Sequence, residues 1–170
     1  MIGEGLIVVG VDGSEPARSA LDFALAEAAR RSARLLVVTA LQPPEYWALN
    51  SGTIYAPDQD HLEKLAEAAG QATRETVDEA VRSVDGAAAV PVETRVVQGN
   101  PAKVLIDQAV DADLLVVGHR GRGALASACL GSVSLQCVLH ATRPVVVVRG
   151  IGRSGAGGGR LIAASAGSPS

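Results

Sequence analysis

The chain has 170 residues, 48% of them hydrophobic and 19% charged, so we expect one globular domain with a substantial core. A net charge of −3 and a total of one Phe, two Tyr and one Trp argue against nucleic acid or an anionic membrane as the partner. The sequence begins without a basic region and signal-length apolar run, and no run is long enough to cross a bilayer, so the expected location is the cytoplasm.

Short, valine-rich apolar runs predict β-strands at residues 6–11, 35–41, 92–97, 114–118 and 145–148. Four of these runs are continuous, which is typical of strands that are covered on both faces of a parallel sheet. The run at 92–97 alternates instead, with Val92, Thr94 and Val96 on one side. We therefore expect it at an edge of the sheet.

Segments with helical periodicity separate the strands. Ser14 is a candidate N-cap, with Pro16 in the first turn, for a helix whose apolar stripe comprises Ala17, Ala20, Leu21, Ala24 and Ala28. A longer helix is predicted from about residue 58 to 84, with Leu62, Leu65, Ala69, Val77, Ala80 and Val84 at helical spacing. Asn100 and Pro101 begin another helix, and residues 132–141 form the last. The alternation predicts an α/β fold with a doubly wound parallel sheet.

Two segments lack this periodicity. Residues 42–57 are long for a connection, and they read either as a lid over a ligand or as a solvated loop pinned by Tyr46 and Trp47. Residues 151–170 are rich in Gly, Ser and Ala and are predicted to form a flexible tail. Residues 1–150 are then a single domain.

A glycine-rich stretch, GHRGRG, follows the run at 114–118, and the turn VDGS follows the run at 6–11. Ligands of open parallel sheets bind beyond the carboxyl ends of the strands, where the winding reverses. If these two strands are neighbours, both turns face one crevice. Glycines at 118, 121 and 123 would let backbone N–H groups approach an anion without a Cβ in the way.

Gly131 opens the last helix, and a helix N-terminus offers free N–H groups and a partial positive charge. The hydroxyls of Ser132 and Ser134 add donors, so the pattern describes a phosphate cradle in two pieces. It is neither a Walker A loop nor a dinucleotide fingerprint, because Gly-Lys-Ser/Thr is absent and VGVDGSEP stands at the first strand-to-helix turn. From the residues alone, a phosphate cradle and a merely flexible connection are equally supported.

The spacing Gly118-x2-Gly121-x9-Gly131-Ser132 resembles the ATP-binding signature of the universal stress protein family, G-x2-G-x9-G-[S/T]. IVVGVDGSEPARSAL, VVQGNPAKVLIDQAVDADLLVVGHRGRG and VLHATRPVVVVR resemble further elements of that family in the same order. Together these stretches cover residues 6–149. The resemblance implies a Rossmann-like, five-stranded parallel α/β sheet of order 3-2-1-4-5.

The resemblance also implies that an adenine nucleotide is held by Val11, Asp12, Gly13, Ala40, Gly118, His119, Gly121, Gly131, Ser132, Val133 and Ser134. Asp12 would contact the nucleotide or its metal, and Ala40 would meet adenine through its backbone. A divalent ion, Mg²⁺ or Mn²⁺, would accompany a triphosphate, because it relieves charge. Arg120 and Arg122 lie at variable positions of the motif; a phosphate contact and a solvated loop face are equally supported for them.

Other interpretations remain open for single residues. Asp12 could merely form an Asx-turn in DGS. His119 could be a general base, but the sequence fixes no nucleophile or carboxylate beside it, so a backbone or ribose contact is preferred. Cys129 and Cys137 fit no metal or redox spacing and read as small buried hydrophobes, with a redox role for Cys129 as the alternative.

The run Val145–Val148 carries no charge, although the predicted order puts it at a sheet edge. An apolar edge invites pairing with a second copy, and the resemblance implies a homodimer through this last strand. The alternative is an edge capped by the C-terminal tail.

The predicted function is that of an ATP-binding regulatory stress-response protein, with AMP or cyclic AMP as alternative ligands. No dedicated water-activating base is evident and no catalytic residue is assigned, so any ATP hydrolysis should be slow. A nucleotide-using enzyme of the same fold is a second hypothesis, although SGGxDS, HxGH and KMSKS-like elements are absent. A third is an interaction protein whose nucleotide only stabilises the dimer.

Overall fold

The computed structural model describes residues 5–42, 59–121 and 130–150. The predicted tail at 151–170 and all but the first residue of the irregular segment at 42–57 lie outside these ranges. Arg122, Gly123 and Cys129 also lie outside them. The predictions made for these residues therefore stay predictions.

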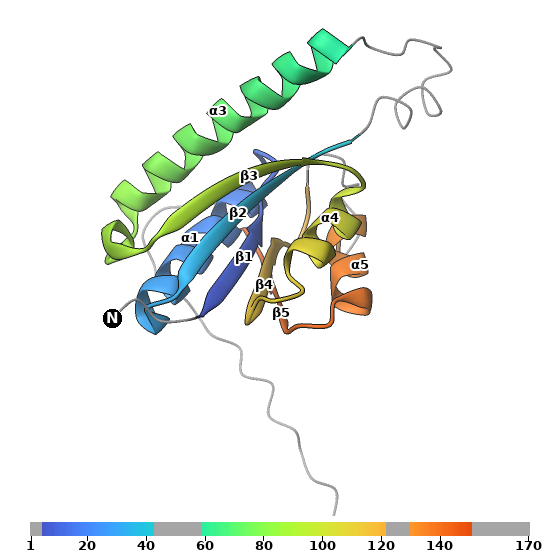
Figure 1. The fold of residues 1–170 in the computed structure, drawn as a ribbon. Coiled ribbons are helices and arrows are strands. Elements are labelled where there is room, and N and C mark those ends of the chain that lie inside the picture. The colour runs from blue at the N-terminus through green and yellow to red at the C-terminus, as the bar shows by residue number, and fades with distance from the viewer. Residues whose placement is uncertain (1–4, 43–58, 122–129, 151–170) are drawn as a thin grey trace, which may run out of the picture.

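All five predicted strands form one parallel sheet (Figure 1). They are β1 (Leu6–Gly10), β2 (Arg34–Leu41), β3 (Val92–Gln98), β4 (Leu114–Gly118) and β5 (Val145–Val148). Their order is β3-β2-β1-β4-β5, which confirms the predicted order 3-2-1-4-5. β1 ends one residue earlier than predicted, yet the Val11 N–H still donates to the Val38 carbonyl at 2.9 Å. The turn that follows β1 is thereby tied to β2.

Helices cover both faces of the sheet. They are α1 (Glu15–Arg31), α3 (Gln59–Ser83), a short 3-10 helix (Ala87–Ala89), α4 (Pro101–Gln108) and α5 (Ser132–His140). α1 and α3 pack with Ile7 and Val9 of β1 in one apolar cluster, and α4 and α5 pack with Val8 in the other (Figure 1). Successive residues of the continuous valine-rich runs therefore enter opposite layers of core, as a parallel sheet requires. None of the described helices combines the length and the apolar character needed to cross a membrane.

The predicted helix starts at Ser14 and Asn100 are confirmed. The Ser14 hydroxyl accepts the Ala17 N–H at 3.4 Å, and Asn100 Oδ1 accepts the Lys103 N–H at 3.1 Å. Both helices carry proline in the first turn, where a missing N–H costs nothing. Every apolar residue predicted for the stripe of α1 is buried, and Leu25 joins it.

β4 is the most enclosed strand, because all five of its residues are buried. β3 alternates between half-buried and exposed positions, as expected for an edge strand. α3 departs from its predicted stripe: its buried residues are Gly70, Thr73, Val77 and Ala80, whereas Leu65 is 47% exposed. The first turns of α3 line an open hollow with Gln98 at the end of β3, so Leu62 and Ala66 are half-buried while Leu65 faces solvent.

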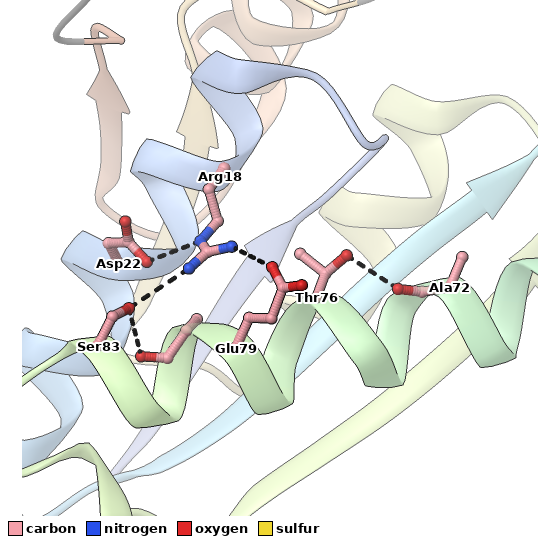
Figure 2. Close-up of polar contacts among 7 residues, drawn as sticks. Arg18, Asp22, Ala72, Thr76, Glu79 and Ser83 are labelled. Atoms are coloured by element: carbon pink, nitrogen blue, oxygen red, sulfur yellow. Dashed lines mark hydrogen bonds and ion pairs between the residues drawn. The ribbon is translucent and has the colours of Figure 1, made fainter. Parts of the chain in front are cut away.

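Arg18 fastens α3 to the beginning of α1 (Figure 2). Its Nε donates to Asp22 Oδ1 at 3.0 Å within α1. Its two terminal nitrogens reach across to α3, to Glu79 Oε2 at 3.2 Å and to Ser83 Oγ at 3.3 Å. The second half of α3 is therefore held by polar contacts as well as by the core, close to the turn that follows β1.

Candidate functional site

The turn between β1 and α1 is an Asx-turn built around Asp12. Asp12 Oδ1 accepts the Ser14 N–H at 3.0 Å and the Ser14 hydroxyl at 2.6 Å. Gly13 between them has a φ of 79°, a left-handed value that suits glycine. The structural role considered for Asp12 from the sequence is thus present. The turn engages Oδ1 of the carboxylate.

The loop after β4 lies against this carboxylate. A Cβ added to Gly121 would stand 2.5 Å from Asp12 Oδ2, closer than any side chain tolerates. Because β1 and β4 are neighbours in the sheet, the two glycine-containing turns face each other at its carboxyl edge, as predicted. Glycine at 121 therefore leaves room for the Asp12 carboxylate, which a side chain at this position would displace.

Gly118 has a different reason to be glycine. A Cβ at this position would lie 2.7 Å from the carbonyl carbon of Pro16 and 2.9 Å from the Ala17 nitrogen, both in the backbone of α1. The sequence suggested that this glycine opens the way to an anion. The structure supplies a packing reason, the close approach of α1 to the end of β4, and the approach of an anion stays a prediction.

His119 links β4, β5 and α5. Its N–H donates to the Val148 carbonyl at 2.7 Å, and its carbonyl accepts the Gly131 N–H at 2.8 Å. Its ring Nδ1 accepts the Gly150 N–H at 3.4 Å, just beyond β5. No local pattern predicts this contact, because its two residues are 31 positions apart in the chain. The backbone N–H groups of His119 and Gly131 are thus used inside the protein.

The N-terminus of α5 completes the arrangement. Gly131 is its N-cap and contributes no side-chain cap, so the N–H groups of the first helical turn have no partner within the helix. Ser134 is 3% exposed and its hydroxyl donates to the Gly118 carbonyl at 2.5 Å. Ser132 is exposed and Val133 half-buried. The Ser134 hydroxyl therefore serves as a brace between α5 and β4, while Ser132 stands at the surface of the turn.

The remaining predicted residues lie at the same edge. Ala40 is half-buried near the end of β2, two residues beyond the carbonyl of Val38 that the Val11 N–H contacts. Arg120 is half-buried, and its Cα lies 3.3 Å from where a Cβ of Gly131 would stand. The structure thus brings together the described members of the predicted set at the carboxyl edge of the sheet.

A metal at this site would depend on Asp12 and on the ligand. Within the described ranges, no group of three or more His, Cys, Asp or Glu side chains gathers into a metal centre. Mg²⁺ commonly uses one or two carboxylates together with substrate phosphates and water. The donor set therefore fits a metal that arrives with a phosphorylated ligand, with Asp12 as the protein's contribution.

A helix N-terminus and a glycine loop at the carboxyl edge of a five-stranded parallel sheet define a Rossmann-like α/β fold of the nucleotide-binding type. The model of the universal stress protein family matches residues 5–149, and the chain belongs to this family. The resemblance to this family that the sequence indicated is thereby confirmed, and its ATP-binding signature stays a prediction.

Known relatives agree with this assignment. A universal stress protein of Mycobacterium tuberculosis is 37% identical over 144 residues, which is 84% of this chain but 45% of that protein. The chain spans about half the length of the mycobacterial relatives it matches. A universal stress protein of Thermus aquaticus is 36% identical, covering 84% of this chain and 97% of its own length.

Solved structures share the fold. A universal stress protein crystallised in complex with cAMP is 29% identical and has a TM-score of 0.59, covering 87% of this chain and 98% of its own.

Proposed function

We propose that this chain binds an adenine nucleotide at the carboxyl edge of β1, β2 and β4 and acts as a cytoplasmic regulatory stress-response protein. ATP is the first candidate, with at most slow hydrolysis. The observation that carries the proposal is the meeting of Asp12, Gly121 and the N-terminus of α5 at one edge of the sheet. Membership of the universal stress protein family supports it.

The residues divide the work by their chemistry. The first N–H groups of α5 would bind phosphate oxygens, because a helix N-terminus favours negative charge. The Asp12 carboxylate stands close to the same loop and would repel a bare triphosphate. Mg²⁺ or Mn²⁺ between Asp12 and the phosphates would turn this repulsion into attraction. Ala40 would contact adenine through its backbone.

Cyclic AMP is the second candidate, because the relative of 29% identity was crystallised with it. A cyclic monophosphate carries a single negative charge and needs no metal to approach the helix N-terminus. The two ligands therefore differ in how they should depend on Asp12 and on divalent ions.

The experiment is calorimetric titration of the full chain with Mg-ATP, ATP in EDTA, AMP and cAMP. For ATP as the ligand, Asp12→Asn should weaken Mg-ATP binding about tenfold or more, as expected for loss of a contact to a charged group. The matched control is Asp111→Asn, which removes the same charge from an exposed position just before β4, at the opposite edge of the sheet.

Tight cAMP binding that is insensitive to EDTA and to Asp12→Asn would replace ATP by cAMP as the ligand. Absence of heat with every nucleotide, together with no small molecule released on denaturation, would refute the proposed function.

The proposal includes a homodimer through β5. All four residues of β5 are half-buried although the strand is at the sheet edge, and Leu135, Val138 and Leu139 of the neighbouring α5 are 45%, 47% and 65% exposed. The N–H groups of Leu115 and His119 donate to the carbonyls of Pro144 and Val148. In a parallel ladder, alternate residues bond to the same neighbouring strand, so the backbone N–H of Val147 points away from β4.

Val147→Pro should therefore remove an outward N–H without removing a β4–β5 bond. Sedimentation should show a dimer for the wild type and a monomer with unchanged circular dichroism for this variant. A monomeric wild type would rule out the dimer.

A further inference from the structure

Ser14 makes three polar contacts at the start of α1. Its hydroxyl donates to Asp12 Oδ1 at 2.6 Å, and its N–H donates to the same oxygen at 3.0 Å. The hydroxyl also accepts the Ala17 N–H, but at 3.4 Å, near the long limit for such a bond. The closest partner of the Ser14 hydroxyl is therefore the carboxylate and not the helix that Ser14 caps.

This pair of hydrogen bonds holds one oxygen of the Asp12 carboxylate, Oδ1. With Oδ1 held by Ser14, Oδ2 is directed at the loop after β4, where a Cβ of Gly121 would stand only 2.5 Å from it. Rotation of the carboxylate would lose the contacts at Oδ1, and a charge-assisted hydrogen bond is among the stronger ones. Ser14 thus holds Oδ1 of the Asp12 carboxylate, and the absence of a side chain at Gly121 leaves room for Oδ2.

We propose that Ser14 is a positioning residue of the nucleotide site: through its hydroxyl it holds Asp12 so that Oδ2 faces the glycine loop, where the metal of a metal-nucleotide is bound. The inference rests on the proposed function and adds a residue to it. Ser14 itself needs no contact with the ligand. Its effect on affinity passes through Asp12.

The test separates this role from helix capping. Ser14→Gly removes the hydroxyl. It costs the helix little stability, because glycine is itself a good N-cap residue. The extended backbone of Ser14, with φ −80° and ψ 159°, suits glycine and threonine alike. Ser14→Thr keeps the hydroxyl. Asn100→Gly is the matched control, since it removes the side-chain cap of α4 without touching Asp12.

The readout is the Mg-ATP affinity of the full chain, measured beside its thermal stability. Ser14→Gly should weaken binding about tenfold, in proportion to the loss of one hydrogen bond to a charged group. Ser14→Thr should restore most of the affinity, and Asn100→Gly should leave it unchanged. In an Asp12→Asn background, Ser14→Gly should have no further effect.

Each alternative result overturns the inference. Wild-type affinity in Ser14→Gly would show that the hydroxyl does not position Asp12, while the proposed function stands. An equal loss in Asn100→Gly would show a general effect of helix caps, and an equal loss in the Asp12→Asn background would show a route that bypasses Asp12. A wild type that binds no nucleotide would instead refute the proposed function, and this inference with it.

Discussion

Substitution of Gly118 by alanine tests the packing between β4 and α1. The added methyl would lie 2.7 Å and 2.8 Å from the carbonyl carbon and oxygen of Pro16, and 2.9 Å from the Ala17 nitrogen. All three atoms are backbone, so no side chain can rotate out of the way. Either the first turn of α1 or the end of the fully buried β4 must move.

The expected cost is at the upper end of that for overpacking a core, about 3 kcal/mol. For a chain of this length, such a loss lowers the melting temperature by about 6–12 °C. Because α1 begins at Ser14, the same displacement disturbs the turn that holds Asp12. Stability and nucleotide affinity should therefore fall together.

The assay is urea unfolding of the nucleotide-free protein, followed by circular dichroism. Gly70→Ala, within helix α3, is the matched control: its Cβ would meet the flexible end of Arg74 at 3.4 Å and Val96 Cγ2 at 3.7 Å, both ordinary van der Waals distances. It should stabilise the protein by about 0.5–1 kcal/mol, the usual gain of alanine over glycine in a helix. If Gly118→Ala kept wild-type stability and lost only nucleotide affinity, the packing argument would be refuted and the anion argument favoured.

Three further predictions concern an acidic side chain, an ion pair and a buried thiol. A hydrogen bond from Arg30, assisted by Arg31 and opposed by desolvation, lowers the pKa of Glu27 from 4.5 to about 2, so its stabilisation is present above pH 4.5 and is lost as the pH falls towards 2. In denaturant titrations, Glu27→Gln should cost about 0.5–1 kcal/mol at pH 7 and much less near pH 2, and an equal cost at both would contradict this. A double-mutant cycle on Arg18 and Glu79 should give a coupling of about 0.5 kcal/mol in urea unfolding, because Glu79 is 64% exposed; zero coupling would mean that the pair does not fasten α3 to α1. Burial raises the pKa of the Cys137 thiol to about 11, so iodoacetamide at pH 8 should label it only in urea, as peptide mass spectrometry would show; rapid labelling of the native protein would count against its burial.

Local patterns in the sequence were sufficient for most of the fold. Continuous valine-rich runs marked the strands that lie between two helical layers, and the alternation in 92–97 marked an edge strand. Ser14 and Asn100 marked helix starts, because capping depends on neighbours a few positions away. Leu65 was misjudged, since the spacing that puts it in an apolar stripe says nothing about where the sheet beneath the helix ends.

The positions of the candidate residues in the fold were predictable, but the contacts that they make were less so. The spacing of Gly118, Gly121 and Gly131 correctly predicted a loop and a helix start at the carboxyl edge of the sheet. It could not reveal that the backbone of α1 approaches Gly118 closely, or that the Ser134 hydroxyl donates a hydrogen bond to the Gly118 carbonyl. Such contacts join positions far apart in the chain, and only the three-dimensional packing brings them together.

The two halves of α3 differ in how they can respond to their surroundings. Its second half is held at Thr73, whose hydroxyl lies 2.7 Å from that of Thr39 on β2, and at the contacts with Arg18. From 59 to 69, by contrast, none of its residues is buried within the part of the chain that the structure describes. A helical turn without core contacts opens at little cost, and its amide hydrogens exchange without global unfolding. The first turns of α3 can therefore fray and reform as a unit of their own, while the sheet below keeps its shape.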